Sequence, residues 1–185
     1  MTRALVFPGQ GSQYVGMGKS LAEAFEPARL VFEEVNDALS QDLSKIMWEG
    51  PEDDLRLTEN TQPALMAHSL AVIRILENGG LKVGELASHV AGHSLGEYSA
   101  LASAGAFSVA DAARLLKLRG QAMQRAVPVG EGAMAAILGL SLEDVNAVVE
   151  EAAKGQVVVA ANDNADGQVV VSGDKAAVER AIEIA

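Results

Sequence analysis

The sequence predicts an α/β protein in two parts, because short apolar runs of strand length alternate with longer segments of helical periodicity. Strands are expected at residues 4–7 and 89–92, and each is followed by a glycine-containing loop and then by a helix. After Pro128 the pattern changes to short β-rich runs that alternate with acidic helices. We therefore expect a domain boundary between residues 1–128 and residues 129–185.

Apolar residues three and four positions apart predict the helices of the first part. One continuous helix is expected over residues 21–39, and residues 41–60, which are polar and contain Gly50 and Pro51, separate it from the next helix. Further helices are expected at residues 61–76, 95–104 and 110–127, with a connection at residues 83–88.

The second part has the order β-α-β-β-α. We expect a strand at residues 133–139, a helix at 141–153, strands at 157–161 and 168–172, and a helix from residue 174 onward. A ferredoxin-type split βαβ unit has this order and needs one more strand. Because the sequence stops at Ala185 inside a helical pattern, without a terminating Gly or Pro, we expect the chain to be a fragment.

Composition excludes several classes of function. A chain of 185 residues with 49% hydrophobic and 21% charged residues can bury a sizeable core. The absence of cysteine excludes disulfides, thiolate catalysis and cysteine-bound metals, so we expect a cytoplasmic protein. A net charge of −11 argues against nucleic-acid binding, and the first residues resemble neither a signal peptide nor a membrane span.

The segment GHSLG, from Gly92 to Gly96, has the GxSxG pattern of a nucleophile elbow, in which flanking glycines permit a sharp turn between a strand and a helix. Such a turn would expose the hydroxyl of Ser94. The helix that follows would point its free N–H groups, Leu95 among them, at an oxyanion formed there. The alternative is that Ser94 only caps this helix.

The loop GQGSQ at residues 9–13 follows the first strand, where glycines could also cradle a phosphate group. Three features argue against a dinucleotide site. The spacing is not GxGxxG, no Lys-Ser or Lys-Thr pair closes the loop, and no second strand ends in an acid about 20 residues later.

Together, FPGQGSQ at residues 7–13 and GHSLGE at residues 92–97 resemble the malonyl/acyl-CoA transacylase family. The resemblance extends to TQPAL at residues 61–65, LRGQAM at 118–123 and AANDNADGQVVVSG at 160–173. It implies an α/β hydrolase-like subdomain with a parallel sheet, followed by a ferredoxin-like subdomain. It also implies transfer of malonyl from malonyl-CoA to the phosphopantetheine thiol of acyl carrier protein, in fatty-acid biosynthesis, without a metal or bound cofactor.

By position, the resemblance makes Ser94 the nucleophile and gives the oxyanion hole to the backbone N–H groups of Gln10 and Leu95. Arg119 would pair with the free carboxylate of the malonyl group, since a guanidinium suits a carboxylate through two parallel hydrogen bonds. His93 and Asn162 are expected beside the site without touching the reacting atoms. The family's general-base histidine is expected outside these 185 residues.

Plainer interpretations exist for several of these residues. Without the resemblance, Arg119 would be one base among several on a solvated helix face, where Arg114 and Lys117 are candidates to contact the anionic substrates. Adjacent side chains on a tight turn point apart, so His93 is not expected to be the base for Ser94. Asn162 could belong to a turn between two strands.

Three other functions stay open at this point. A serine hydrolase would share the elbow and pass the acyl group to water. An acyltransferase domain of a polyketide synthase would use the same chemistry within a longer chain. A non-catalytic binding module would keep the pocket without the base, and labelling of Ser94 would separate these possibilities.

Overall fold

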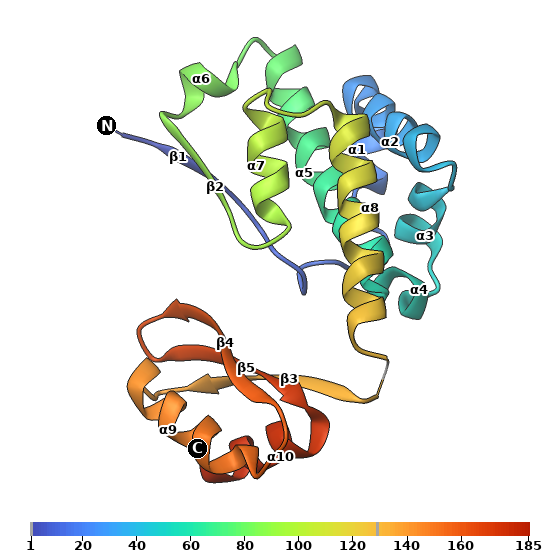
Figure 1. Cartoon of the computed structure of the whole chain (residues 1–185). Coiled ribbons are helices and arrows are strands. Elements are labelled where there is room, and N and C mark those ends of the chain that lie inside the picture. Colours follow the sequence, from blue (N-terminus) through green and yellow to red (C-terminus); the bar gives the residue numbers. More distant parts are fainter. Residues whose placement is uncertain (1, 129) are drawn as a thin grey trace. The chain divides into compact units, whose positions relative to one another are not determined.

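The structure, a computed structural model, describes residues 2–128 and 130–185, and the chain forms two compact units (Figure 1). The first unit extends to Gln124 and the second begins at Arg125. Within the described residues the fold is α/β, with ten helices, one small parallel sheet and one small antiparallel sheet. The chain passes between the units in the last turn of α8 (Val109–Ala126). The boundary predicted after residue 128 stays a prediction.

The sheet of the first unit consists of the two predicted strands, β1 (Ala4–Phe7) and β2 (His89–Gly92). They pair in parallel, with Ala4 opposite His89 and Phe7 opposite Gly92 (Figure 1). In a parallel pair the carboxyl ends of both strands lie at the same edge. The loop after Phe7 and the turn after Gly92 are therefore neighbours in space.

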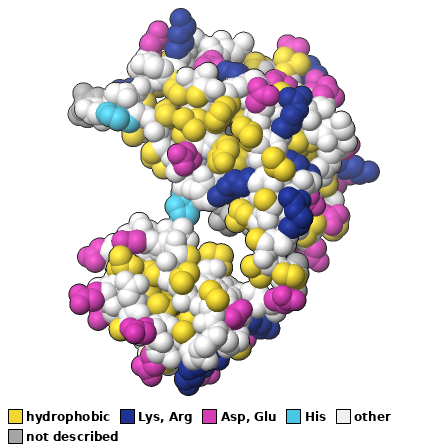
Figure 2. All heavy atoms as spheres, in the orientation of Figure 1, with side chains coloured by type: hydrophobic (Ala, Val, Ile, Leu, Met, Phe, Trp, Pro, Cys, Tyr) yellow, Lys and Arg dark blue, Asp and Glu magenta, His cyan; other side chains and the backbone are white. Residues whose placement is uncertain are grey.

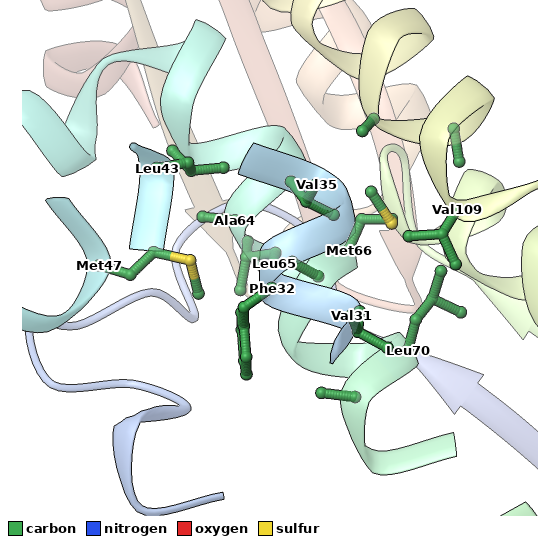
Figure 3. Packing of buried hydrophobic residues seen from close by; sticks show 14 of the residues in the cluster. Val31, Phe32, Val35, Leu43, Met47, Ala64, Leu65, Met66, Leu70 and Val109 are labelled. Atoms are coloured by element: carbon green, nitrogen blue, oxygen red, sulfur yellow. The ribbon is translucent and has the colours of Figure 1, made fainter. Parts of the chain in front are cut away.

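Helices form the rest of the first unit. The predicted helix at residues 61–76 is confirmed as α5 (Thr58–Asn78), and it packs against α2 (Glu26–Leu39) in the centre of the core. Figure 3 shows Phe32 and Val35 of α2 in one buried cluster with Leu65 and Leu70 of α5. The predicted helices near residues 95–104 and 110–127 are confirmed as α7 (Gly96–Ser103) and α8.

The prediction of one continuous helix over residues 21–39 was wrong. The structure has α1 (Lys19–Ala24), then Phe25 with an extended backbone at φ −133° and ψ 114°, and then α2. The cause is Pro27, which has no N–H and whose ring would clash with the carbonyl four residues earlier in a continuous helix. Proline is tolerated in a first turn, so α2 begins anew around it.

Short helices were missed in the polar residues 41–60 and in the connection predicted at residues 83–88. These are α3 (Leu43–Glu49), α4 (Glu52–Arg56) and α6 (Val83–Leu86). The carboxylate of Asp42 caps α3 by accepting a hydrogen bond from the N–H of Lys45 at 3.1 Å. Leu43 and Met47 of α3 and Leu55 of α4 are fully buried, so packing against the core stabilises helices too short to form alone.

The second unit confirms the predicted β-α-β-β-α order. Its elements are β3 (Gly132–Leu138), α9 (Leu142–Ala153), β4 (Val158–Ala165), β5 (Gln168–Asp174) and α10 (Lys175–Ile184). The three strands form an antiparallel sheet in the order β3-β5-β4, and its core includes Val145, Val169, Val171 and Val178. β4 continues to Ala165, beyond the expected end at residue 161, with shifts of register that interrupt its pairing with β5.

Among the helices of the described residues, none combines the length and the apolar character that a membrane span requires.

Candidate active site

The GxSxG segment forms a tight turn between β2 and α7, and Ser94 lies at its tip with its side chain exposed. Its backbone has φ +56°, in the left-handed region that non-glycine residues avoid at a cost of about 1–2 kcal/mol. The turn is closed by hydrogen bonds from the Gly96 N–H to the His93 carbonyl, at 2.9 Å, and from the Glu97 N–H to the Ser94 carbonyl, at 3.1 Å. A strained serine in such a turn indicates function rather than capping alone.

Two glycines of this segment are required by close packing. A Cβ added at Gly92 would lie 1.9 Å from the carbonyl carbon of Gly96, so the turn closes only without a side chain there. A Cβ added at Gly96 would lie 2.4 Å from the carbonyl oxygen of Phe7, at the end of β1. The elbow therefore lies directly against the other strand of the sheet.

The loop after β1 lies against the elbow, as the parallel pairing requires. The His93 N–H donates to the Phe7 carbonyl at 3.1 Å, and a Cβ added at Gly9 would lie 2.5 Å from Nδ1 of His93. The structure thus brings the two motifs together, although one lies at residues 7–13 and the other at residues 92–97.

The backbone amides of Gln10 and Leu95 lie in these two adjacent segments. Leu95 is 1% exposed and is the N-cap residue of α7, whose backbone N–H groups at its first turn carry a partial positive charge. Within residues 2–128 and 130–185 neither amide has a hydrogen-bond partner, so both remain able to donate to an oxyanion. The Gln10 side chain makes a long contact, 3.4 Å from its Nε2 to Oγ1 of Thr58.

Arg119 reaches Ser94 from α8. Its Nη2 donates to Oγ of Ser94 at 3.0 Å, and its Nη1 donates to Oε1 of Gln62 at 2.7 Å. The guanidinium carbon also lies 5.9 Å from the ring centre of Tyr98, within the range of a cation–π contact. A fixed positive charge beside Oγ favours negative charge that develops there, and it can also bind an anionic group of a substrate.

Comparisons with known proteins identify the family of this chain. The profile of the acyl transferase domain family matches residues 4–184. The chain belongs to the acyl transferase domain family. It is 49% identical to the malonyl CoA-acyl carrier protein transacylase of Escherichia coli K12 over 178 residues, which are 96% of this chain and 57% of that protein.

Solved structures give the same result for the fold. The crystal structure of acyl-carrier-protein-S-malonyltransferase from Bartonella henselae matches with a TM-score of 0.96 and 59% identity, over 100% of this chain and 59% of that one. A malonyl-transacylase solved in complex with a type II polyketide acyl carrier protein matches with a TM-score of 0.92 and 48% identity, over 99% of this chain and 58% of that one. The chain thus spans less than two thirds of the length of these relatives.

The other bases on α8 of this acyl transferase domain differ in their surroundings. Lys117 is turned inward, and its Nζ bonds Oε1 of Gln41 at 2.9 Å and Oδ1 of Asn60 at 3.0 Å. Arg114 is exposed and pairs with Asp111 at 3.2 Å. Figure 2 shows Lys and Arg side chains near α8, while Asp and Glu are scattered over the visible surface. Of the two, Arg114 has the more exposed side chain, at 58% against 19% for Lys117.

Asn162 belongs to the second unit, where it lies within β4 opposite Val170 and is half-buried. It is therefore part of the strand, and the alternative of a turn residue was wrong. Its expected role beside the site, like that of His93, stays a prediction. In the described part of the chain no group of three or more His, Asp or Glu side chains could hold a metal ion.

Sequence reasoning missed two residues of the site in this acyl transferase domain, Gln62 and Tyr98, whose side chains hold the guanidinium of Arg119. Gln62 lies in TQPAL, at the start of the predicted helix, and Tyr98 lies in the first turn of α7. The sequence signal that could have found Gln62 was a polar residue at a helix position where the periodicity calls for an apolar one.

Proposed function

We propose that this chain carries the acyl-binding part of a malonyl-CoA:acyl carrier protein transacylase, which works in fatty-acid biosynthesis. The observation that carries the proposal is the 3.0 Å hydrogen bond from Nη2 of Arg119 to Oγ of Ser94. A guanidinium at this distance from a nucleophile suits an acyl group that has a free carboxylate close to its thioester. Malonyl is such a group, whereas acetyl is not.

In the first half-reaction Oγ of Ser94 attacks the thioester carbon of malonyl-CoA. A bond forms between Oγ and that carbon, and the carbonyl oxygen becomes an oxyanion that accepts hydrogen bonds from the N–H groups of Gln10 and Leu95. The carbon–sulfur bond then breaks, and coenzyme A leaves as a thiol with the proton taken from Ser94. By resemblance, a histidine outside these 185 residues moves that proton.

In the second half-reaction the phosphopantetheine thiol of acyl carrier protein attacks the malonyl ester of Ser94. The same two N–H groups stabilise the oxyanion, and Oγ of Ser94 leaves and regains a proton. The relative solved in complex with an acyl carrier protein supports this choice of partner. Because the acyl group passes through a covalent ester, this ping-pong cycle needs neither a metal nor a bound cofactor.

The finer description of the fold belongs to the same proposal. The parallel strands and the elbow of the first unit are those of an α/β hydrolase-like subdomain, and the order β3-β5-β4 is that of three strands of a ferredoxin-like subdomain. We also propose a cytoplasmic location, on the basis of the cysteine-free sequence.

Intact-mass spectrometry tests the function directly. The protein, produced as its gene encodes it, is incubated with malonyl-CoA and, separately, with acetyl-CoA. We expect one malonyl adduct on Ser94, loss of the adduct on addition of phosphopantetheinylated acyl carrier protein, and no adduct in Ser94→Ala. Arg119→Met should lower malonyl loading and leave the slower acetyl loading nearly unchanged.

Two results would contradict the proposal. If malonyl-CoA and acetyl-CoA loaded the wild-type protein equally, Arg119 would have no role in selecting the malonyl group. Faster release of the acyl group to water than to the carrier protein would indicate a hydrolase instead.

A further inference from the structure

Gln62 is a fully buried polar side chain in the second turn of α5, with an exposed fraction of 0%. A buried amide is costly unless its donor and acceptor are both used. Its Oε1 accepts from Nη1 of Arg119 at 2.7 Å, and its Nε2 lies 3.2 Å from Sδ of Met123, a weak acceptor. Both partners are on α8, four residues apart, so they lie on one face of that helix.

The approach of α8 to α5 makes this contact possible. A Cβ added at Gly120 would lie 2.5 Å from Cα of Glu59, so the two backbones are in contact directly beside Arg119. Gln124 of α8 also accepts from the Glu59 N–H at 3.0 Å. Backbone packing therefore fixes the separation of the two helix segments that carry Gln62 and Arg119.

We propose that Gln62 is the positioning residue that orients Arg119 and thereby selects acyl groups with a free carboxylate. The proposal rests on the proposed function. A guanidinium can meet a carboxylate with either of two edges, and these edges differ in direction. Nη1 donates one of its two N–H groups to Gln62, which leaves the edge formed by Nε and Nη2 fully available, and Nη2 is already at Ser94.

The chemical type of Gln62 matters as much as its position. A neutral amide accepts a hydrogen bond from Arg119 without cancelling its charge, so the full charge stays available for the substrate. A glutamate in the same place would hold the guanidinium in the same orientation while neutralising it. Orientation and charge can therefore be separated by substitution.

Three variants test this inference. Gln62→Met keeps the size of the side chain and replaces the amide oxygen by a weakly accepting thioether, and Gln62→Glu keeps an acceptor and adds a negative charge. The matched control is Gln41→Met, because Oε1 of Gln41 accepts from Lys117, the other inward-facing cation of α8. Urea midpoints of all three are measured first, to establish that each variant is folded.

The first readout is independent of catalysis. Nitrogen NMR of the arginine side chains measures how fast the Arg119 guanidinium rotates about its Nε–Cζ bond. We expect slow rotation in the wild type, in Gln62→Glu and in Gln41→Met, and rotation at least about tenfold faster in Gln62→Met, where one hydrogen bond to the cation is lost. Unchanged rotation in Gln62→Met would overturn the positioning role.

The second readout is the rate of Ser94 loading with malonyl-CoA divided by that with acetyl-CoA. We expect this ratio to fall about 10- to 100-fold in Gln62→Met and in Gln62→Glu, and to be unchanged in Gln41→Met. A ratio that stays at the wild-type value in Gln62→Met would overturn the inference while leaving the proposed function intact. Loss of malonyl loading in the wild type itself would instead refute the proposed function, and with it the selection by Gln62.

Discussion

Replacing Gly120 by alanine should destabilise the first unit, although alanine is the better helix former. In a helix interior alanine is favoured over glycine by about 0.5–1 kcal/mol. A Cβ at Gly120 would, however, lie 2.5 Å from Cα and 2.8 Å from N of Glu59, and 2.7 Å from the carbonyl oxygen of Thr58. All are backbone atoms, so the clash is relieved only by moving α8 away from α5. Overpacking of this kind costs about 1–3 kcal/mol, and we expect a net loss of about 1–2 kcal/mol.

Urea unfolding followed by the fluorescence of Trp48, the single tryptophan, measures this loss in the first unit alone. Gly84→Ala in α6 is the matched control, because a Cβ there would meet no heavy atom within 4 Å. It should leave the free energy of unfolding unchanged or raise it by up to about 1 kcal/mol. If the urea midpoint of Gly120→Ala were at or above that of the wild type, α8 would not pack directly on α5 as described.

Two further predictions concern stability. Burial lowers the pKa of His68 below its ordinary value of 6.5, and Nδ1 of His68 is buried without a hydrogen-bond partner among the described residues. The unfolded chain therefore binds more protons than the folded one as the pH falls below 6.5, so the free energy of unfolding should drop there. His68→Gln should show a smaller drop in urea titrations from pH 8 downward. Asp42→Ala removes the cap of α3 and should cost about 1 kcal/mol in the same assay, whereas Asp42→Asn should restore most of the loss; equal midpoints for both variants would contradict the capping role.

The parts of the fold that the sequence predicted well are those with strong local signals. Both strands of the first unit and the β-α-β-β-α order of the second follow from apolar runs between glycines and from helical periodicity. The break at Phe25 was missed, although the decisive residue, Pro27, was visible in the sequence. α3 and α4 could not be recognised, because their stability comes from burying Leu43, Met47 and Leu55 in a core that local pattern does not reveal.

The candidate site divides in the same way. Ser94 and its flanking glycines were identified by a local motif, because the strained turn needs those residue types at that spacing. Arg119 was assigned by resemblance alone, since on a helix with three other bases nothing local distinguishes it. Gln62 was missed because its importance comes from what lies opposite it, 57 residues later in the chain.

By itself the sequence determined the chemical groups of the candidate site: a serine on a glycine-flanked turn, a basic helix, and no cysteine for thiolate chemistry. Only the tertiary structure decided which base meets the serine. That outcome depends on the parallel pairing of β1 with β2 and on the backbone contact of α8 with α5 at Gly120. These contacts join residues far apart in the chain, and packing between helices and strands sets their geometry. Local periodicity in the sequence does not predict that packing.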